Sequence, residues 1–218
     1  MNAEDARTNK IIDAFADRLL RSGIDGVGPL HSASEVATAV GTATVSDDAA
    51  IDRIVRDHMR LAASEGFVTG LGGFLTLPVA LPANVVSFYV LATRMVAAIA
   101  AVRGHDLSSD AVRTAVLLVL SGDDATDVLR KAGVVAGKGR MTSLVTRGLP
   151  PSALMAVNKG VAFRLMVQLS EKGLAKFGRF IPGVGGLVGG GLDAYLMRRL
   201  SKRARNDFTR VSPPTGLA

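Results

Sequence analysis

Three charged residues stand at the edges of the two long uncharged segments of the sequence. Glu65 directly precedes residues 66–93, which contain no charge and no histidine; Arg94 directly follows them, and Asp193 follows the glycine-rich residues 180–192. If the two segments pack together, these three side chains form one buried cluster. A buried charge needs an opposite charge, and such a cluster is either a structural ion pair or a site for catalysis or ion binding. The sequence leaves both alternatives open.

The residue patterns that usually mark enzymes and metal sites are missing from the sequence. Without a cysteine, the chain has no thiol nucleophile, no disulfide and no thiolate zinc site. His31, His58 and His105 are too widely spaced to form a ligand pair on one helix, and no H-E-x-x-H or G-x-S-x-G motif occurs. The glycines around Lys138 lack the spacing and the hydroxyl of a phosphate loop. We therefore predict no cofactor and no metal ion, and we expect a role other than catalysis.

A run of basic residues near the C-terminus is a candidate binding surface. Residues 1–65 carry 7 basic and 11 acidic side chains, whereas residues 66–218 carry 19 basic and 8 acidic ones. This excess attracts anionic partners. Nucleic acid is not predicted, because the chain has no tryptophan to stack on bases, and the mean hydropathy of +0.31 favours a membrane instead. The residues expected to contact a membrane or another anion are Arg198, Arg199, Lys202, Arg203 and Arg205.

Small residues spaced four apart precede this basic run. Gly185, Gly186, Gly189 and Gly190 would share one side of a helix, where another backbone can approach closely. Tight packing within a core, self-association and insertion at a membrane are all compatible with this spacing. We predict helix packing at these four glycines and leave the partner open.

Helical periodicity dominates the rest of the sequence, and no long stretch alternates with a period of two. The predicted fold class is therefore all-α, a multi-helix bundle. Pro78 and Pro82 each remove a backbone donor and disfavour helix before them. We predict a Gly/Pro-rich apolar helical hairpin, with one helix ending near Pro78 and the next running from about Ala83 to Arg103, instead of a rod through a bilayer. Further helices are expected over residues 3–21, 46–65, 108–122, 123–135 and 151–177, and in a basic helix ending near Phe208.

Composition divides the chain into three parts. Residues 1–45 are expected to form an amphipathic helix and a glycine-rich linker with room for one short helix, residues 46–210 the main helical domain, and residues 211–218 a disordered tail. The first ten residues contain two acids and do not resemble a signal or transit peptide. We therefore expect a cytoplasmic protein.

The chain contains an ordered set of short motifs over roughly residues 50–210. They are Ala63-Ser64-Glu65-Gly66, Thr69-Gly70-Leu71-Gly72-Gly73, Leu77-Pro78, Leu81-Pro82, Arg94, Ile99-Ala100, Gly104-His105-Asp106, Ile181-Pro182-Gly183, Gly185-Gly186, Gly189-Gly190 and Ala204 to Phe208. This set resembles the EcsC family of bacterial proteins. The sequence departs from the family pattern at Ala80 and Asp193, where relatives generally have an acid and an asparagine. The family name comes from an accessory protein associated with an ABC-type exporter, so the resemblance implies membrane association.

The leading hypothesis is a non-catalytic, membrane-peripheral accessory or scaffold protein at the inner face of the cell membrane. Its apolar hairpin and basic C-terminal helix would contact anionic lipid or a membrane protein, for which the resemblance suggests an ABC-type exporter. The alternative is an enzyme or metal-dependent protein that uses a buried cluster of Glu65, Arg94 and Asp193. A third hypothesis is a homo-oligomer held by the glycine-rich segments.

Overall fold

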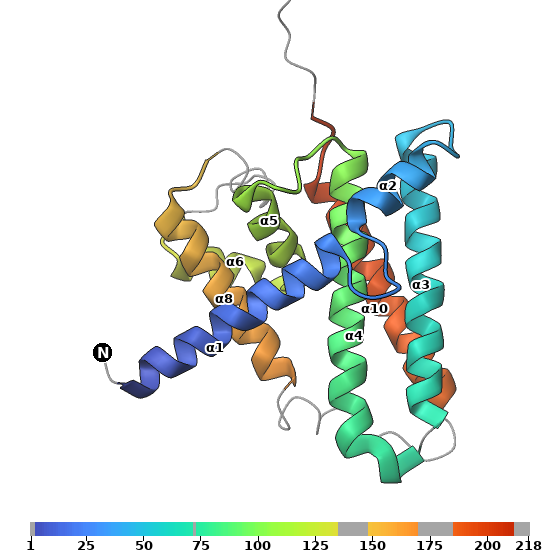
Figure 1. The fold of residues 1–218 in the computed structure, drawn as a ribbon, viewed down its shortest axis with the longest axis horizontal. Helices are drawn as coiled ribbons and strands as arrows, with labels where there is room; N and C mark the ends of the chain where they lie inside the picture. Colours follow the sequence, from blue (N-terminus) through green and yellow to red (C-terminus); the bar gives the residue numbers. More distant parts are fainter. Residues whose placement is uncertain (1–2, 72, 135–147, 170–184, 212–218) are drawn as a thin grey trace, which may run out of the picture.

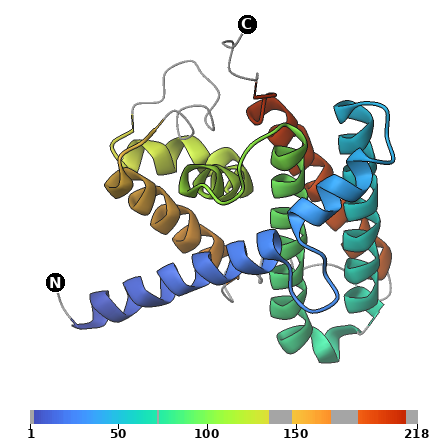
Figure 2. The same ribbon diagram turned by 45° about the horizontal axis from the view of Figure 1, so that its top comes forward.

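The computed structural model describes residues 3–71, 73–134, 148–169 and 185–211, and within these ranges the protein is a helical bundle without a sheet, as predicted. α3, α4 and α10 form a three-helix bundle, and α5, α6 and α8 form a second group beside it (Figure 1). α1 crosses α8 and extends away from the body, while α2 packs against α3 and α4 (Figure 2). The helices are α1 (Ala3–Leu20), α2 (Ala33–Gly41), α3 (Asp47–Leu71), α4 (Gly73–Val102), α5 (Asp110–Leu120), α6 (Ala125–Lys131), α8 (Pro151–Leu169) and α10 (Gly185–Asp207).

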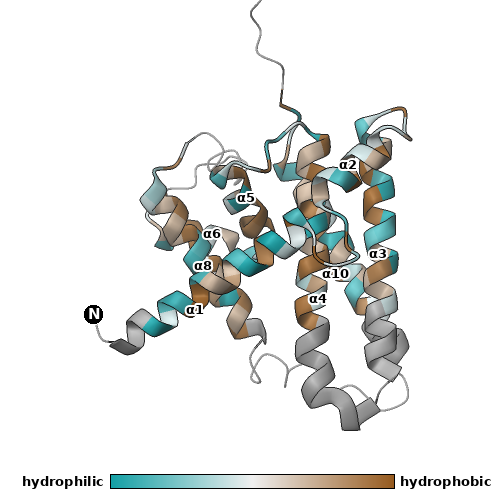
Figure 3. Ribbon diagram, in the orientation of Figure 1, coloured by the Kyte–Doolittle hydropathy of each residue, from teal (hydrophilic) through white to brown (hydrophobic). Residues whose placement is uncertain are grey.

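α4 is the central helix, because both groups of helices contact it. Residues 91–100 are all buried, and most of them form one hydrophobic core with apolar residues of the neighbouring helices. Figure 3 shows the hydropathy of the residues along these helices. A helix that is apolar all round requires such burial. Val85–Val102 is long and apolar enough to cross a membrane, but more than half of this stretch is buried inside the protein, which is also a property of ordinary core helices.

The apolar hairpin forms, but its turn is not where the prolines predicted it. α3 continues to Leu71, and α4 begins at Gly73 and passes through Pro78 and Pro82 without interruption. The predicted helix end near Pro78 is therefore wrong. The two prolines are four residues apart and share one side of α4, so the helix accommodates them by bending, as its first turns show in Figure 1.

Residues 22–45 are more regular than the predicted linker. The Ser32 hydroxyl accepts from the Glu35 N–H at 3.2 Å, and the Glu35 carboxylate accepts from the Ser32 N–H at 2.8 Å, a capping box that starts α2. Before it lies a single π-helical turn, Arg21–Asp25, that packs against α4. Side chains of this segment and of α1 belong to the same hydrophobic core as those of α4 and α5. The core is thus shared across residue 45, and the division of the chain at that residue stays a prediction.

The other predicted helices are present with shifted bounds. The 123–135 helix is observed as a 3-10 turn, Gly122–Asp124, followed by the short α6. The helix predicted from Pro151 begins there, but its predicted end near Phe177 and all of the tail after Val211 lie outside the described residues. The sequence also predicts a basic loop over residues 137–151, of which residues 137–147 lie outside the described residues.

Candidate functional site

Arg94 is buried in the three-helix bundle, with 5% of its surface exposed. Its Nε–H donates to Nε2 of His58 on α3 at 3.1 Å, and the other ring nitrogen of His58, Nδ1, bonds the Ile54 carbonyl oxygen at 2.8 Å. A carbonyl oxygen only accepts, so Nδ1 carries the proton and Nε2 accepts from the arginine. This geometry requires the neutral form of His58.

The surroundings of His58 also hold it neutral. Burial, together with the smaller effect of the Arg94 charge, lowers the pKa of His58 from 6.5 to about 4, against the opposing effects of the hydrogen bond with Ile54 and the charge of Asp57. The contact therefore joins a charged guanidinium to an uncharged ring, and it leaves the Arg94 charge for another group to compensate. Arg94 and Asp193 each take part in a further interaction.

The structure brings together the three helices that carry the residues of the predicted cluster. Glu65 and Asp193 lie on α3 and α10, which pack along their length, and Arg94 lies on α4, which contacts both. Asp193 is half-buried, and the side chain of Glu65 is outside the description. His58 was not predicted from the sequence as a partner of Arg94, because the pairing depends on how α3 packs against α4. Among the described residues, no group of three His, Asp or Glu side chains is arranged to hold a metal ion.

Three of the five predicted basic residues are engaged in ion pairs. Arg199 and Arg203 both bind the Asp123 carboxylate, at 2.5 and 2.6 Å, and Arg205 binds Asp52 at 2.5 Å. The hydrogen bond from Arg203 and the charge of Arg199 lower the pKa of Asp123. These three arginines therefore attach α10 to the turn before α6 and to α3, and less of their charge is available to an external anion.

The remaining two predicted basic residues, Arg198 and Lys202, are exposed and have no carboxylate partner in the described part of the chain. α3 adds Arg56, which is likewise exposed without such a partner, and Arg60, which is 3.8 Å from Asp57. We call Arg56, Arg60, Arg198 and Lys202 the basic surface.

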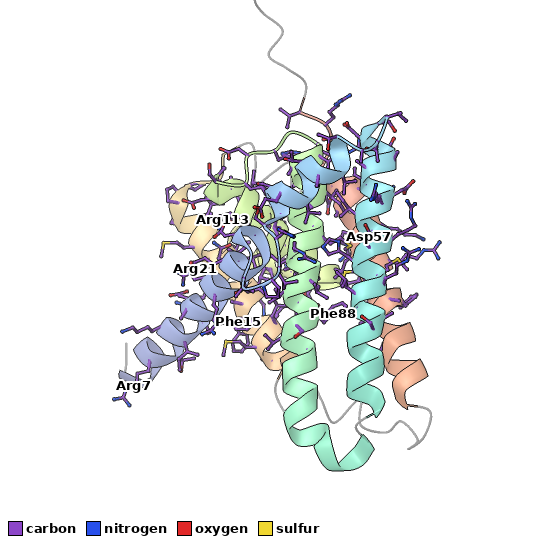
Figure 4. All side chains as sticks on the ribbon, turned by 45° about the vertical axis from the view of Figure 1, so that its right-hand side comes forward. Arg7, Phe15, Arg21, Asp57, Phe88 and Arg113 are labelled. Atoms are coloured by element: carbon purple, nitrogen blue, oxygen red, sulfur yellow. The ribbon has the colours of Figure 1, made fainter. Side chains whose placement is uncertain are left out.

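These four residues come together because α3 and α10 are antiparallel. The ion pair Arg205–Asp52 fixes the register of the two helices, which places Lys202 level with Val55 and Arg198 level with Met59. Figure 4 shows long side chains projecting from this edge of α3 around Asp57. Arg56 and Arg60 were not predicted as part of this surface, although their spacing of four places them on one side of the helix.

The predicted glycines occupy the first turns of α10. Gly190 is buried within the bundle, whereas the adjacent Gly191 has open space where a side chain would begin. Gly185, Gly186 and Gly189 lie in the same helix, and their surroundings are outside the description. Packing at these three glycines stays a prediction.

The sequence profile of the EcsC protein family matches residues 40–211. The chain belongs to the EcsC protein family. No curated protein and no solved structure matches it. The EcsC region begins within α2 and contains the whole three-helix bundle, including Arg94 and the basic surface. α1 lies outside the EcsC region, although Ile12 and Leu19 of that helix are buried in the common core.

Proposed function

We propose that this EcsC family protein is a non-catalytic accessory or scaffold protein that attaches to the anionic inner face of the cell membrane through its basic surface. The observation that carries the proposal is the placement of Arg56, Arg198 and Lys202, which are exposed on neighbouring helices without carboxylate partners in the described residues. The exposed Tyr195 lies one turn from Arg198 on α10. Tyrosine beside lysine and arginine suits the headgroup layer. An ABC-type exporter, which the family resemblance suggests, is the proposed membrane-protein partner.

The expected attachment is weak and reversible. Each well-placed cation contributes about 1 kcal/mol at an anionic surface, so Arg56, Arg198 and Lys202, which have no carboxylate partner in the described residues, supply about 3 kcal/mol, comparable to a dissociation constant of several millimolar. Salt screens this attraction within about 10 Å at 0.1 M ionic strength. We therefore expect the electrostatic part of binding to disappear in a high-salt wash.

Vesicle flotation tests the proposal. The full chain should float with vesicles that contain phosphatidylglycerol and stay behind with neutral phosphatidylcholine vesicles. The double variant Arg198→Gln/Lys202→Gln should bind anionic vesicles about 30-fold more weakly, since two cations at about 1 kcal/mol each are removed.

The matched control is Arg7→Gln/Lys10→Gln, which removes the same charge from exposed positions of α1. It should bind like the unmodified protein. Equal flotation on neutral and anionic vesicles would contradict the attachment to anionic lipid. An equal loss in both double variants would assign the effect to net charge instead of to the basic surface.

A second candidate function, an enzyme or metal-dependent protein, is favoured by one observation: Arg94 is a buried charge in an otherwise apolar helix. The residues proposed for this site are Glu65, Arg94 and Asp193. The test combines elemental analysis of the purified protein with the Asp193→Asn variant in cells. A metal-free protein whose variant has no phenotype would rule out this candidate. The homo-oligomer stays a separate prediction, which a monomeric mass in light scattering would contradict.

A further inference from the structure

One end of the three-helix bundle has no charged residue in the part of the chain that the structure describes. The register fixed by Arg205–Asp52 places Asp193 of α10 level with Ser64 of α3, next to Glu65. Beyond this level, α3 contributes residues 66–71 and α10 contributes residues 185–192, all of them uncharged. At a rise of 1.5 Å per residue these segments extend about 9 to 12 Å.

The start of α4 completes this end of the bundle. His58–Arg94 and Asp48–Arg103 fix the register of α3 with α4 and place Glu65 level with about residue 87. As a straight helix, residues 73–86 would extend about 21 Å, which is about twice the length of the facing α3 segment, residues 66–71. α4 therefore has to bend, and Figure 1 shows its first turns running across the end of the bundle. We call residues 66–71, 73–86 and 185–192 the uncharged end.

The depth of the uncharged end distinguishes two kinds of membrane contact. A helix that spans a bilayer must cross about 30 Å of hydrocarbon, whereas an interfacial segment enters only about 5 to 10 Å. The 9 to 12 Å estimated here from the helical rise matches the second case.

Two residues of the basic surface lie at the height that the lipid headgroups would occupy. Arg60 and Arg198 are each five residues from the level of Glu65 and Asp193, which corresponds to about 7.5 Å along the helices. The headgroup layer of one leaflet is roughly 5 to 8 Å thick. Insertion of the uncharged end would thus place Glu65 and Asp193 at its border and bring Arg60 and Arg198 to the height of the phosphates.

We propose that the uncharged end enters the interfacial layer of one leaflet without crossing the membrane, while the basic surface contacts the headgroups of the same leaflet. The occupant of this end is therefore the lipid bilayer. This inference rests on the proposed attachment to anionic lipid, and it adds an apolar, salt-resistant component that the basic surface alone does not provide.

Single tryptophans test the insertion, because the natural chain has none. Phe74→Trp places a tryptophan in the uncharged end, and Leu77→Trp is a second variant in case the first does not fold. Val45→Trp is the control, since Val45 is fully exposed in the loop between α2 and α3, at the opposite end of the bundle. Each variant is mixed with phosphatidylglycerol vesicles whose acyl chains carry bromine either near the headgroup or near the bilayer centre.

Shallow bromine should quench about half of the fluorescence of Trp at position 74 or 77, deep bromine much less, and neither should affect position 45. Stronger quenching by deep bromine would overturn the shallow insertion. Flotation without quenching at 74 and 77 would overturn the insertion and leave the electrostatic attachment intact. Emission that is blue-shifted in buffer and unchanged by vesicles would show that the chain itself covers this end, which also overturns the proposal. No flotation of any variant would refute the proposed function itself.

Discussion

His58 combines a buried ring with two hydrogen bonds that require its neutral form. Arg94 donates to one ring nitrogen, and the other donates to the Ile54 carbonyl. A proton added at Nε2 would displace the hydrogen bond from Arg94 and place two positive charges in contact within the core. The low pKa of His58 follows from this arrangement and from burial.

The pH dependence of stability should reveal this histidine. Between pH 6.5 and about 4 the unfolded chain binds a proton at His58 that the native protein does not, so the free energy of unfolding falls as the pH falls. The full lowering of the His58 pKa corresponds to a decrease of roughly 3 kcal/mol in the free energy of unfolding. Chemical denaturation from pH 7 to pH 4 should show a shallower fall for His58→Gln, whose amide can still accept from Arg94.

His31→Gln provides the comparison, because His31 is exposed. It should keep the pH profile of the unmodified protein. A His58→Gln profile parallel to that of the unmodified protein would contradict a neutral His58 in the native state.

At the scale of elements, one glycine allows the π-helical turn to contact α4. A Cβ atom at Gly23 would lie 2.4 Å from Cβ of Thr93 and 3.1 Å from the Val90 carbonyl oxygen, far inside ordinary contact distances. Thr93 is fully buried and cannot move aside easily. The missing side chain at position 23 is thus a packing requirement.

Gly23→Ala should therefore destabilise the protein by about 1 to 3 kcal/mol, because either the turn or α4 has to shift. The measurement is the midpoint of denaturant unfolding. Gly41→Ala in α2 is the matched control, since a Cβ there meets nothing within 4 Å, and it should be neutral or slightly stabilising. Equal stability of both variants would mean that the turn is free to move away from α4.

Sequence patterns predicted the elements better than their ends. The helix predicted over residues 46–65 is present, and the helical spacing of Ile51, Ile54 and His58 marks its buried face. The prolines were misleading, since local preference marks Pro78 and Pro82 as breaks while the packed helix bends around them. The chain reverses at the glycines near residue 72 instead.

The candidate sites depended even more on tertiary structure. Asp52 is 153 residues from Arg205, and Asp123 is 76 residues from Arg199, so no local pattern could reveal which arginines are neutralised. The burial of Arg94 was predictable from its uncharged surroundings. Its bond to His58 was not, because it requires the register of two helices.

At the scale of the whole molecule, α1 is part of the common core even though it precedes the EcsC region. Ile12, Leu19 and Leu20 are at least 93% buried, and Ile24 of the following turn is buried with them. Burying one such side chain contributes about 1.5 to 3 kcal/mol. The N-terminal residues should therefore stabilise the entire fold.

Deletion of residues 1–31 should lower the thermal unfolding midpoint by more than about 10 °C, because several core side chains are lost together. Circular dichroism measures this shift. Deletion of residues 1–8 is the control, because Arg7 and Thr8 are exposed, and it should change the midpoint little. An unchanged midpoint in the longer deletion would show that α1 is an independent arm.

The last described residues of the chain, 209–211, are held beside the C-terminal end of α4. The Val211 N–H donates to the Arg103 carbonyl oxygen at 2.9 Å, and His105 Nε2 bonds the Thr209 carbonyl oxygen at 2.8 Å. Arg103 lies at the opposite end of the helix from Gly73. If the uncharged end enters the membrane as proposed, a fluorescent protein fused to the C-terminus would be attached at the far end of the bundle, and such a fusion should not obstruct the insertion.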